Sequence, residues 1–225
     1  MASAPEPTEP TPDVIAATKA IARRDPVMRA FIAKAGPARL RGGMGDYFGA
    51  LVRAIMYQQL AGAAAAAIHG RFVEALGGTV TPEAVLAADP QTLRAAGLSA
   101  AKLAAVIDLA QKSTDGTVPL EDLYELPDDE LVARLSSVRG IGRWTAEMFL
   151  LFELRRLDVW PVDDLGVRNG YRIIYGLPEM PKPKELQALG EVFRPYRSIA
   201  AWYCWQAVHL SRGDMLLPGG EAAPR

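Results

Sequence analysis

Apolar positions along this chain recur with the spacing of helices almost throughout. The clearest apolar stripe follows Asp46 and is formed by Tyr47, Phe48, Leu51, Val52, Ile55 and Met56. We find no sustained alternation of apolar and polar residues, which would mark a half-buried strand, and no internal repeat. The pattern therefore predicts an all-α fold of about twelve helices joined by short loops.

Residues that typically begin or end helices lie between the apolar stretches and predict the helix boundaries. Side chains with N-cap chemistry predict helix starts at Asp13, Asp25, Asp46, Thr81 and Ser99. The pair Gly77-Gly78 is expected to stop an alanine-rich helix near Leu76. The stretches 37–45 and 115–120 are candidate boundaries between two lobes, with the chain returning to the first lobe at its end. One helical domain is expected over 13–212, flanked by a disordered tail at 1–12 and a flexible tail at 213–225.

Composition narrows the class of protein. The 225 residues are 50% hydrophobic and 23% charged, as in an ordinary globular protein, and no apolar run approaches the roughly 18 to 20 residues of a membrane span. Without a secretory leader, the expected location is cytoplasmic, with no membrane partner. One cysteine and two histidines argue against a disulfide framework, an iron–sulfur cluster and most metal triads. Because the net charge is −1, any surface that binds nucleic acid must be a local patch.

The most informative stretch is a glycine turn between two apolar helices. The first predicted helix carries Leu131, Val132 and Leu135, and the second carries Trp144, Met148, Leu151 and Phe152. Gly140 and Gly142 permit a tight turn around Ile141, which can point inward and tie the helices together. The amides at the start of the second helix suit a phosphate, and Arg139 and Arg143 add positive charge.

Three interpretations of this turn compete. It can be a structural turn without function. A dinucleotide-binding fingerprint fits poorly, because no strand precedes the turn and Thr145 stands where a third glycine belongs. The third interpretation is a helix-hairpin-helix that grips a DNA backbone without reading its sequence.

Two adjacent carboxylates follow about twenty residues later. Pro161 ends the preceding segment, and Asp163 fits the role of N-cap for the next helix. Asp164 would then lie in the first turn, where the helix dipole favours an ionised carboxylate. Such a group can stabilise a developing positive charge or position a water molecule.

These segments together resemble the helix-hairpin-helix DNA glycosylase superfamily, and most of all its 3-methyladenine DNA glycosylase II branch. The resemblance covers residues 13–212 and rests on L-S-S-V-R-G-I-G-R-W-T-A-E at 135–147, P-V-D-D-L-G-V-R at 161–168, and segments 53–60, 89–94, 97–102 and 194–205. It implies a two-lobed helical fold with the active-site cleft between the lobes. It also implies a monomer that binds double-stranded DNA containing alkylated bases.

The resemblance assigns roles to individual residues of this chain. The catalytic carboxylate is Asp164, with Asp163 as second choice. The base pocket comprises Trp144, Met148 and Trp205. DNA contacts are expected from Gln58, Gln59, Leu60, Arg139, Gly140, Gly142, Arg143 and Thr145, with Gln59 or Leu60 as the residue that wedges into the duplex. Carbonyl groups of Ser136, Val138 and Gly140 would hold a structural Na⁺ or K⁺, and the chemistry itself requires no cofactor.

The implied activity is monofunctional release of bases such as 3-methyladenine and 7-methylguanine by base flipping and hydrolysis. Relatives that also cut the DNA backbone carry a lysine at the position of Trp144, and relatives with an iron–sulfur cluster carry four cysteines. The alternatives are a non-catalytic DNA-binding module and a bifunctional glycosylase/lyase. Helices are expected from Asp13, which leaves no place for the β-rich domain that precedes them in well-known members. Because that domain is expected to be absent and Met148 stands where an aromatic residue would narrow the pocket, the range of lesions stays open.

Aromatic residues near the end of the chain have a simpler interpretation as well. Trp202, Tyr203 and Trp205 lie on one predicted helix, where such stripes are usually core. Trp205 is expected to be a pocket residue, with a core position as the alternative. Cys204, His69 and His209 are expected to be packing or surface residues.

Overall fold

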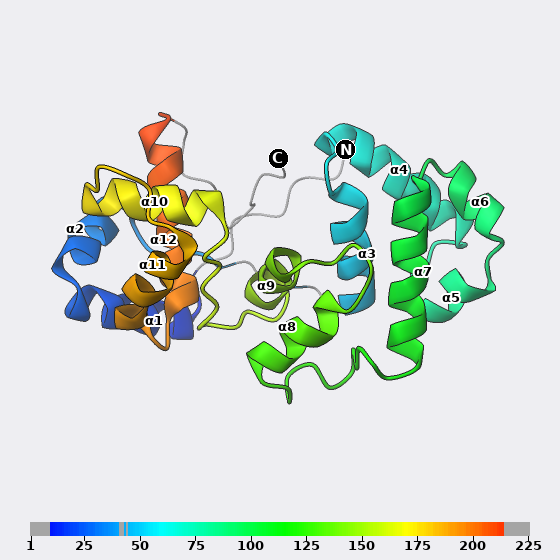
Figure 1. The fold of residues 1–225 in the computed structure, drawn as a ribbon, viewed down its shortest axis with the longest axis horizontal. Helices are drawn as coiled ribbons and strands as arrows, with labels where there is room; N and C mark the ends of the chain where they lie inside the picture. The colour runs from blue at the N-terminus through cyan, green and yellow to red at the C-terminus, as the bar shows by residue number, and fades with distance from the viewer. Residues whose placement is uncertain (1–9, 41–42, 44, 214–225) are drawn as a thin grey trace. The chain divides into compact units, whose positions relative to one another are not determined.

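The computed structural model describes residues 10–40, 43 and 45–213 (Figure 1). These residues form α-helices and one 3₁₀-helix, with no strand among them, as the apolar spacing predicts. In chain order the elements are α1 (Pro12–Arg24), α2 (Pro26–Ala35), α3 (Tyr47–Tyr57), α4 (Gly62–Ala75), α5 (Pro82–Ala87), α6 (Pro90–Ala95), α7 (Ala100–Thr114), α8 (Asp128–Ser136), α9 (Arg143–Phe152), α10 (Leu165–Tyr175), α11 (Pro183–Leu189), η1 (Gly190–Phe193) and α12 (Arg197–Ser211).

The described residues divide into two compact units. Unit 1 contains the residues up to 40 and from 150 onward, and unit 2 contains those from 43 to 149. The chain leaves unit 1 within the predicted stretch 37–45 and returns inside α9, between Phe149 and Leu150. The second candidate boundary, 115–120, is wrong: the fully buried side chains of Val118 and Leu123 hold this segment inside unit 2. Most of each predicted tail lies outside the described residues.

Most of the predicted helix starts are confirmed by side-chain caps. The carboxylates of Asp25 and Asp46 accept hydrogen bonds from the amides of Met28 (2.7 Å) and Gly49 (2.9 Å), and Thr81 and Ser99 cap α5 and α7 in the same way. Asp13 is not a cap: α1 already begins at Pro12, because proline suits the first helical position, and Asp13 lies in the first turn.

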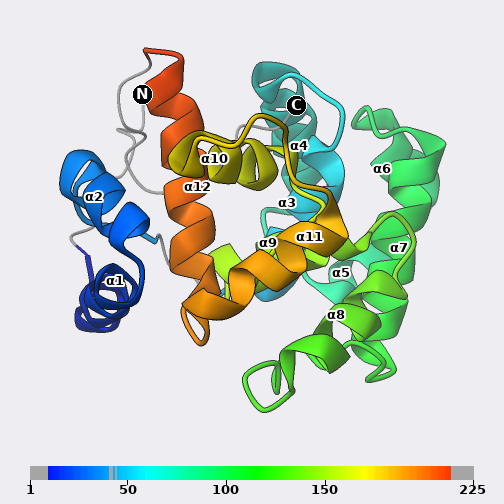
Figure 2. The ribbon, with the colours of Figure 1, turned by 60° about the vertical axis from the view of Figure 1, so that its left-hand side comes forward.

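In unit 1, α10 crosses α12 at very short range (Figures 1 and 2). A Cβ atom on Gly170 of α10 would lie only 1.9 Å from the carbonyl oxygen of Cys204 on α12. Only a residue without a side chain allows the two backbones to approach this closely. This contact places the middle of α10 against the middle of α12.

Unit 2 is organised around α7, which contacts α3, α5 and α6. Figure 1 shows α7 and α3 as neighbouring helices of this unit. The face of α7 that packs inward carries Leu103, Ala105, Val106, Leu109 and Ala110. No helix within the described ranges combines the length and apolarity needed to cross a bilayer.

Candidate active site and DNA-binding hairpin

Asp164 is a buried carboxylate at the beginning of α10. Its side chain is the N-cap: Oδ1 accepts a hydrogen bond of 2.8 Å from the amide of Val167. Oδ1 also accepts a hydrogen bond of 2.9 Å from the indole Nε1 of Trp205 on α12. Asp164 is 8% exposed, and its carboxylate lies at the N-terminal end of α10.

The two adjacent aspartates thus have different environments from those expected. Asp163 is exposed and lies in the turn before α10, so its predicted role as the cap is wrong. The cap is Asp164, one residue later, because the turn that begins at Pro161 ends with a hydrogen bond from the Asp164 amide to the Pro161 carbonyl. Of the two carboxylates, only Asp164 is buried and held by donors from two different helices.

Trp205 reaches this carboxylate because a glycine leaves room for its ring. A Cβ atom on Gly166 would lie 2.7 Å from Cδ1 of the Trp205 indole. On its other side the indole stacks on Phe152, with ring centroids 5.7 Å apart and 30° between planes. Gly166 and Phe152 were not predicted as site residues. The sequence did contain a signal for Gly166, because this glycine lies two positions after the candidate catalytic carboxylate Asp164.

The neighbours of Trp205 on α12 are core residues. Trp202 and Tyr203 are buried, which confirms the simpler interpretation of this aromatic stripe for these two side chains. Cys204 is fully buried, and its burial together with the nearby charge of Asp164 raises the pKa of the thiol. The thiol is therefore neutral and serves as packing, as expected. Trp205, in contrast, is only partly buried.

The hairpin between α8 and α9 has the predicted inward and outward sides. Val138 and Ile141 are buried, whereas Arg139, Gly140 and Gly142 are exposed. Gly140 has a φ of 79°, a left-handed conformation that favours glycine. A Cβ atom there would also lie 3.2 Å from the Cβ of Ala105 on α7. The structure thus shows why the turn needs its first glycine.

Side chains of α7 hold the backbone of the first half of this turn, at Ser137 and Arg139. The Asp108 carboxylate accepts a hydrogen bond of 2.7 Å from the amide of Arg139. Lys112 forms an ion pair of 3.0 Å with Asp108 and donates to the carbonyl of Ser137. Partial burial opposes ionisation of Asp108, but the Arg139 amide and the Lys112 ammonium hold its pKa below the usual range. The hairpin is therefore fixed to α7 by ionised groups.

The first turn of α9 carries the other predicted contacts. Trp144 is 41% exposed, and Met148, one helical turn later, is half-buried on the same side. The Arg143 guanidinium donates to the buried Glu147 carboxylate at 2.8 Å, which orients its charge along the helix. Thr145 is half-buried beside them. Amides in the first turn of a helix have no partner within the helix, so this end suits an anion.

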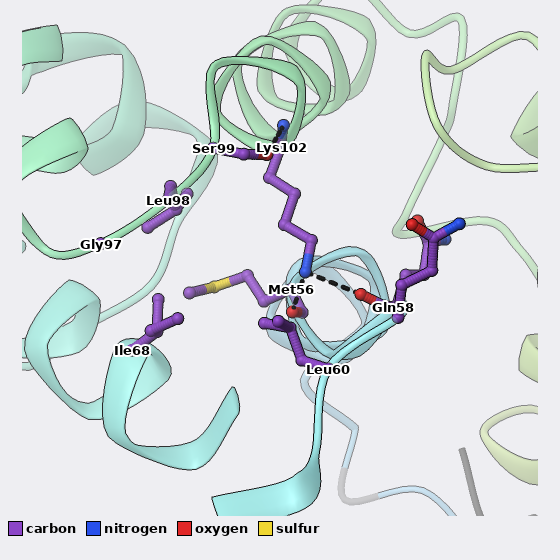
Figure 3. A pocket seen from close by; sticks show the side chains of 9 residues that line it. Met56, Gln58, Leu60, Ile68, Gly97, Leu98, Ser99 and Lys102 are labelled. Carbon is purple, nitrogen blue, oxygen red and sulfur yellow. Dashed lines mark hydrogen bonds between the residues drawn. The ribbon is translucent and has the colours of Figure 1, made fainter. Parts of the chain in front are cut away.

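A second exposed loop of unit 2 follows α3. Gln59 is exposed and has a φ of 57°, an uncommon conformation for a residue with a side chain. The residues on either side of Gln59 are held by contacts with the rest of unit 2. Gln58 Nε2 donates to the Gly140 carbonyl at 2.9 Å. Leu60 lines a pocket together with apolar residues of α3 and α4 (Figure 3). This loop and the hairpin are therefore in direct contact. Of the two predicted wedge residues, Gln59 is the exposed one.

The predicted site for a monovalent cation consists of backbone carbonyl groups in the hairpin, not of side chains. No group of three or more His, Cys, Asp or Glu side chains suited to a metal ion occurs within the part of the chain that the structure describes. The carbonyls of Val138 and Gly140 each accept one hydrogen bond, from the Ile141 amide and from Gln58. Since a carbonyl oxygen has two lone pairs, both retain capacity for a monovalent cation.

Comparison with known proteins identifies the family. Residues 52–195 match the HhH-GPD superfamily of base excision DNA repair proteins. DNA-3-methyladenine glycosylase 1 of Schizosaccharomyces pombe is 41% identical over 164 residues, covering 72% of each chain. A solved structure of a 3-methyladenine DNA glycosylase from that yeast, in complex with abasic DNA, covers 85% of this chain and 95% of its own, at 35% identity and a TM-score of 0.71. A DNA-3-methyladenine glycosidase from Bacillus halodurans covers 88% of this chain and 92% of its own, at 32% identity and a TM-score of 0.82. The all-helical fold and these similarities agree, and the chain belongs to the HhH-GPD superfamily of base excision DNA repair proteins.

Proposed function

We propose that this protein is a monofunctional DNA glycosylase that releases alkylated bases from double-stranded DNA by hydrolysis of the N-glycosyl bond. The observation that carries the proposal is the buried Asp164, held by the Val167 amide and the Trp205 indole. A module that only binds DNA has no use for such a carboxylate, since negative charge near the phosphates costs affinity. The similarity to 3-methyladenine glycosylases supports the same activity.

The mechanism follows from the chemistry of an alkylated purine. The target base must leave the stack before its sugar can be reached, and the hairpin and the loop at Gln59 supply contacts to the surrounding DNA. A base alkylated at a ring nitrogen is positively charged, so its bond to the sugar is already weak and needs no strong general acid. Asp164 stabilises the oxocarbenium-like sugar as the bond breaks and guides water to it. The products are the free base and an abasic site.

The proposed base pocket combines aromatic and polarizable side chains. Trp144, Met148 and Trp205 would contact the flipped base, with stacking worth roughly 1–3 kcal/mol per base. A cation–π contribution of about 0.5–2 kcal/mol favours a positively charged base over a normal one. Trp144 has no amine to form a Schiff base with the sugar, so the enzyme releases the base without cutting the strand.

The hairpin is the proposed site of phosphate and cation binding. Amides of Gly140 and Gly142 and the hydroxyl of Thr145 would bind a DNA phosphate, assisted by Arg139 and Arg143. Carbonyls of Ser136, Val138 and Gly140 would hold a structural Na⁺ or K⁺, which would strengthen the field toward the phosphate. The chemistry needs no other cofactor. The protein would act as a monomer, inside the cell where the DNA lies.

A direct assay tests the activity. Incubation with randomly methylated duplex DNA should release free 3-methyladenine or 7-methylguanine, measured by chromatography of the soluble fraction. The DNA strands should stay intact until hot alkali cleaves the abasic sites, because no Schiff base forms. Release with simultaneous strand cleavage would contradict a monofunctional enzyme. Tight DNA binding without release of any base would favour the non-catalytic module.

The geometry of the hairpin predicts that a substitution at Gly140 weakens binding to damaged and undamaged DNA alike. Gly140→Ala forces a Cβ into a left-handed residue and toward Ala105. Because this turn contacts the DNA backbone, affinity for damaged and undamaged duplexes should fall together, by about fivefold to tenfold. Fluorescence anisotropy with labelled duplexes measures both affinities.

A matched control separates backbone strain from loss of the hairpin. Gly116 also has a left-handed φ, 81°, but no atom lies within 4 Å of a Cβ built on it. Gly116→Ala therefore carries similar strain after α7 and should leave DNA affinity unchanged. Equal affinities of the two variants would contradict the role of the hairpin.

A further inference from the structure

The loop at Gln59 is held by a lysine that belongs to another helix. Lys102 lies in the first turn of α7, and its ammonium extends to the end of α3 (Figure 3). Nζ donates to the carbonyl of Met56 at 2.6 Å and to the carbonyl of Gln58 at 2.8 Å. One side chain thus satisfies two carbonyls at a helix end, where the last four have no partner within the helix.

The electrostatics of this contact favour a fixed ammonium. The C-terminal end of α3 carries the negative end of the helix dipole, which attracts a cation. Partial burial lowers the pKa of Lys102, so the charged form relies on the carbonyls that surround it. No carboxylate ion pair with Lys102 is found among the described residues, and its recorded hydrogen-bond acceptors are these two backbone oxygens.

The loop itself needs such support. Gln59 has a left-handed φ of 57°, a conformation that is unfavourable for a residue with a Cβ because the Cβ crowds the following carbonyl oxygen. A conformation of this kind persists when its surroundings determine it. Lys102 fixes the backbone before Gln59, Gln58 is bonded to Gly140 of the hairpin, and Leu60 packs toward Met56 in the pocket after it. The three anchors leave Gln59 as the exposed residue between them.

We propose that Lys102 is a positioning residue for duplex opening: it clamps the end of α3 and so presents Gln59 to the DNA. This inference rests on the proposed glycosylase function. Lys102 acts through the loop and does not contact the reacting atoms. Its loss should therefore matter when a base must be extracted from a paired stack and should matter little when the base is already unpaired.

The experiment compares one methylated oligonucleotide in two forms, single-stranded and annealed to its complement. Lys102→Met should lower kcat/KM for 7-methylguanine release from the duplex about tenfold, and from the single strand less than about twofold. Lys102→Arg retains a cationic donor and should recover most of the duplex activity. Lys34→Met, which removes an exposed lysine at the end of α2, is the control for loss of charge and should match the native protein.

Two further measurements distinguish the clamp from other roles. If Lys102 acts through Gln59, adding Lys102→Met to Gln59→Ala should cost less than about twofold on the duplex. A direct phosphate contact would instead reduce the dependence of log Kd on log salt concentration by about one unit, and this result would overturn the proposal. Equal losses on duplex and single strand would also overturn it.

Hydrogen exchange of the free protein tests the clamp without any DNA. Amides of residues 58–60 should exchange faster in Lys102→Met than in the native protein or in Lys34→Met. If the native protein released no base at all, the proposed function would fail, and this exchange result would still decide whether Lys102 holds the loop. Unchanged exchange at 58–60 would show that it does not.

Discussion

Replacement of Asp164 by asparagine should lower the rate of base release by about 10²- to 10³-fold, while the fold is retained and the DNA affinity is equal to or higher than that of the native protein. Asparagine has nearly the same shape, and its carbonyl oxygen can accept both hydrogen bonds that Oδ1 accepts, from Val167 and Trp205. It is also a good N-cap for α10. The substitution therefore removes the negative charge and little else. Single-turnover release of 7-methylguanine measures the effect, with anisotropy to measure DNA binding.

The neighbouring aspartate provides the matched control. Asp163 carries the same charge one residue earlier but is exposed and does not cap α10. Asp163→Asn should therefore release bases at the native rate within about twofold. If Asp163→Asn lost activity and Asp164→Asn kept it, the assignment of the catalytic carboxylate would be reversed. If both variants were fully active, the active site would lie elsewhere.

Replacement of Gly170 by alanine should destabilise unit 1 by more than about 3 kcal/mol. The new Cβ would lie 1.9 Å from the Cys204 carbonyl oxygen, which is backbone within a helix and cannot rotate away. Relief requires α10 and α12 to separate, and that movement disrupts the packing of the α12 core residues. Thermal unfolding should show a melting temperature lower by about 10 °C.

A second helical glycine separates crowding from the general effect of the substitution. Gly70 lies inside α4, and no atom is within 4 Å of a Cβ built on it. Gly70→Ala should stabilise the protein by about 0.5–1 kcal/mol, because alanine is the better helix former. Opposite signs for the two variants are the expected result. A stable Gly170→Ala protein would mean that α10 and α12 do not cross as closely as the structure shows.

Local signals in the sequence account for much of the fold. Caps such as Asp25 and Asp46 act on amides three residues away, so the chain near each cap contains all the information required. The same holds for the hairpin, where Gly140 adopts the left-handed φ and Ile141 points inward as predicted. The short helix α6 was not predicted, although Asp89 caps it in the same manner.

The motifs also indicated the family, and they restricted the proposed catalytic carboxylate to two adjacent residues, with Asp164 as the first choice. Asp163 and Asp164 were both plausible, and spacing favoured the first as the cap. The structure differs because the turn from Pro161 runs one residue longer, so that Asp164 caps α10 and is buried. A shift of one residue at a helix start changes which side chain faces the solvent, and the local sequence does not determine it.

The sequence by itself determined most of the helices and of their caps, the glycine hairpin and the family to which they belong, because each depends on residues close together in the chain. Only the tertiary structure decided the contacts between distant residues. The Trp205 indole is hydrogen-bonded to Asp164, which is 41 positions away in the chain. The Lys102 ammonium is hydrogen-bonded to the carbonyl of Gln58, which is 44 positions away. The physical reason is that these contacts depend on how closely helices approach, and that distance is set by packing, as at Gly166 and Gly170 against α12.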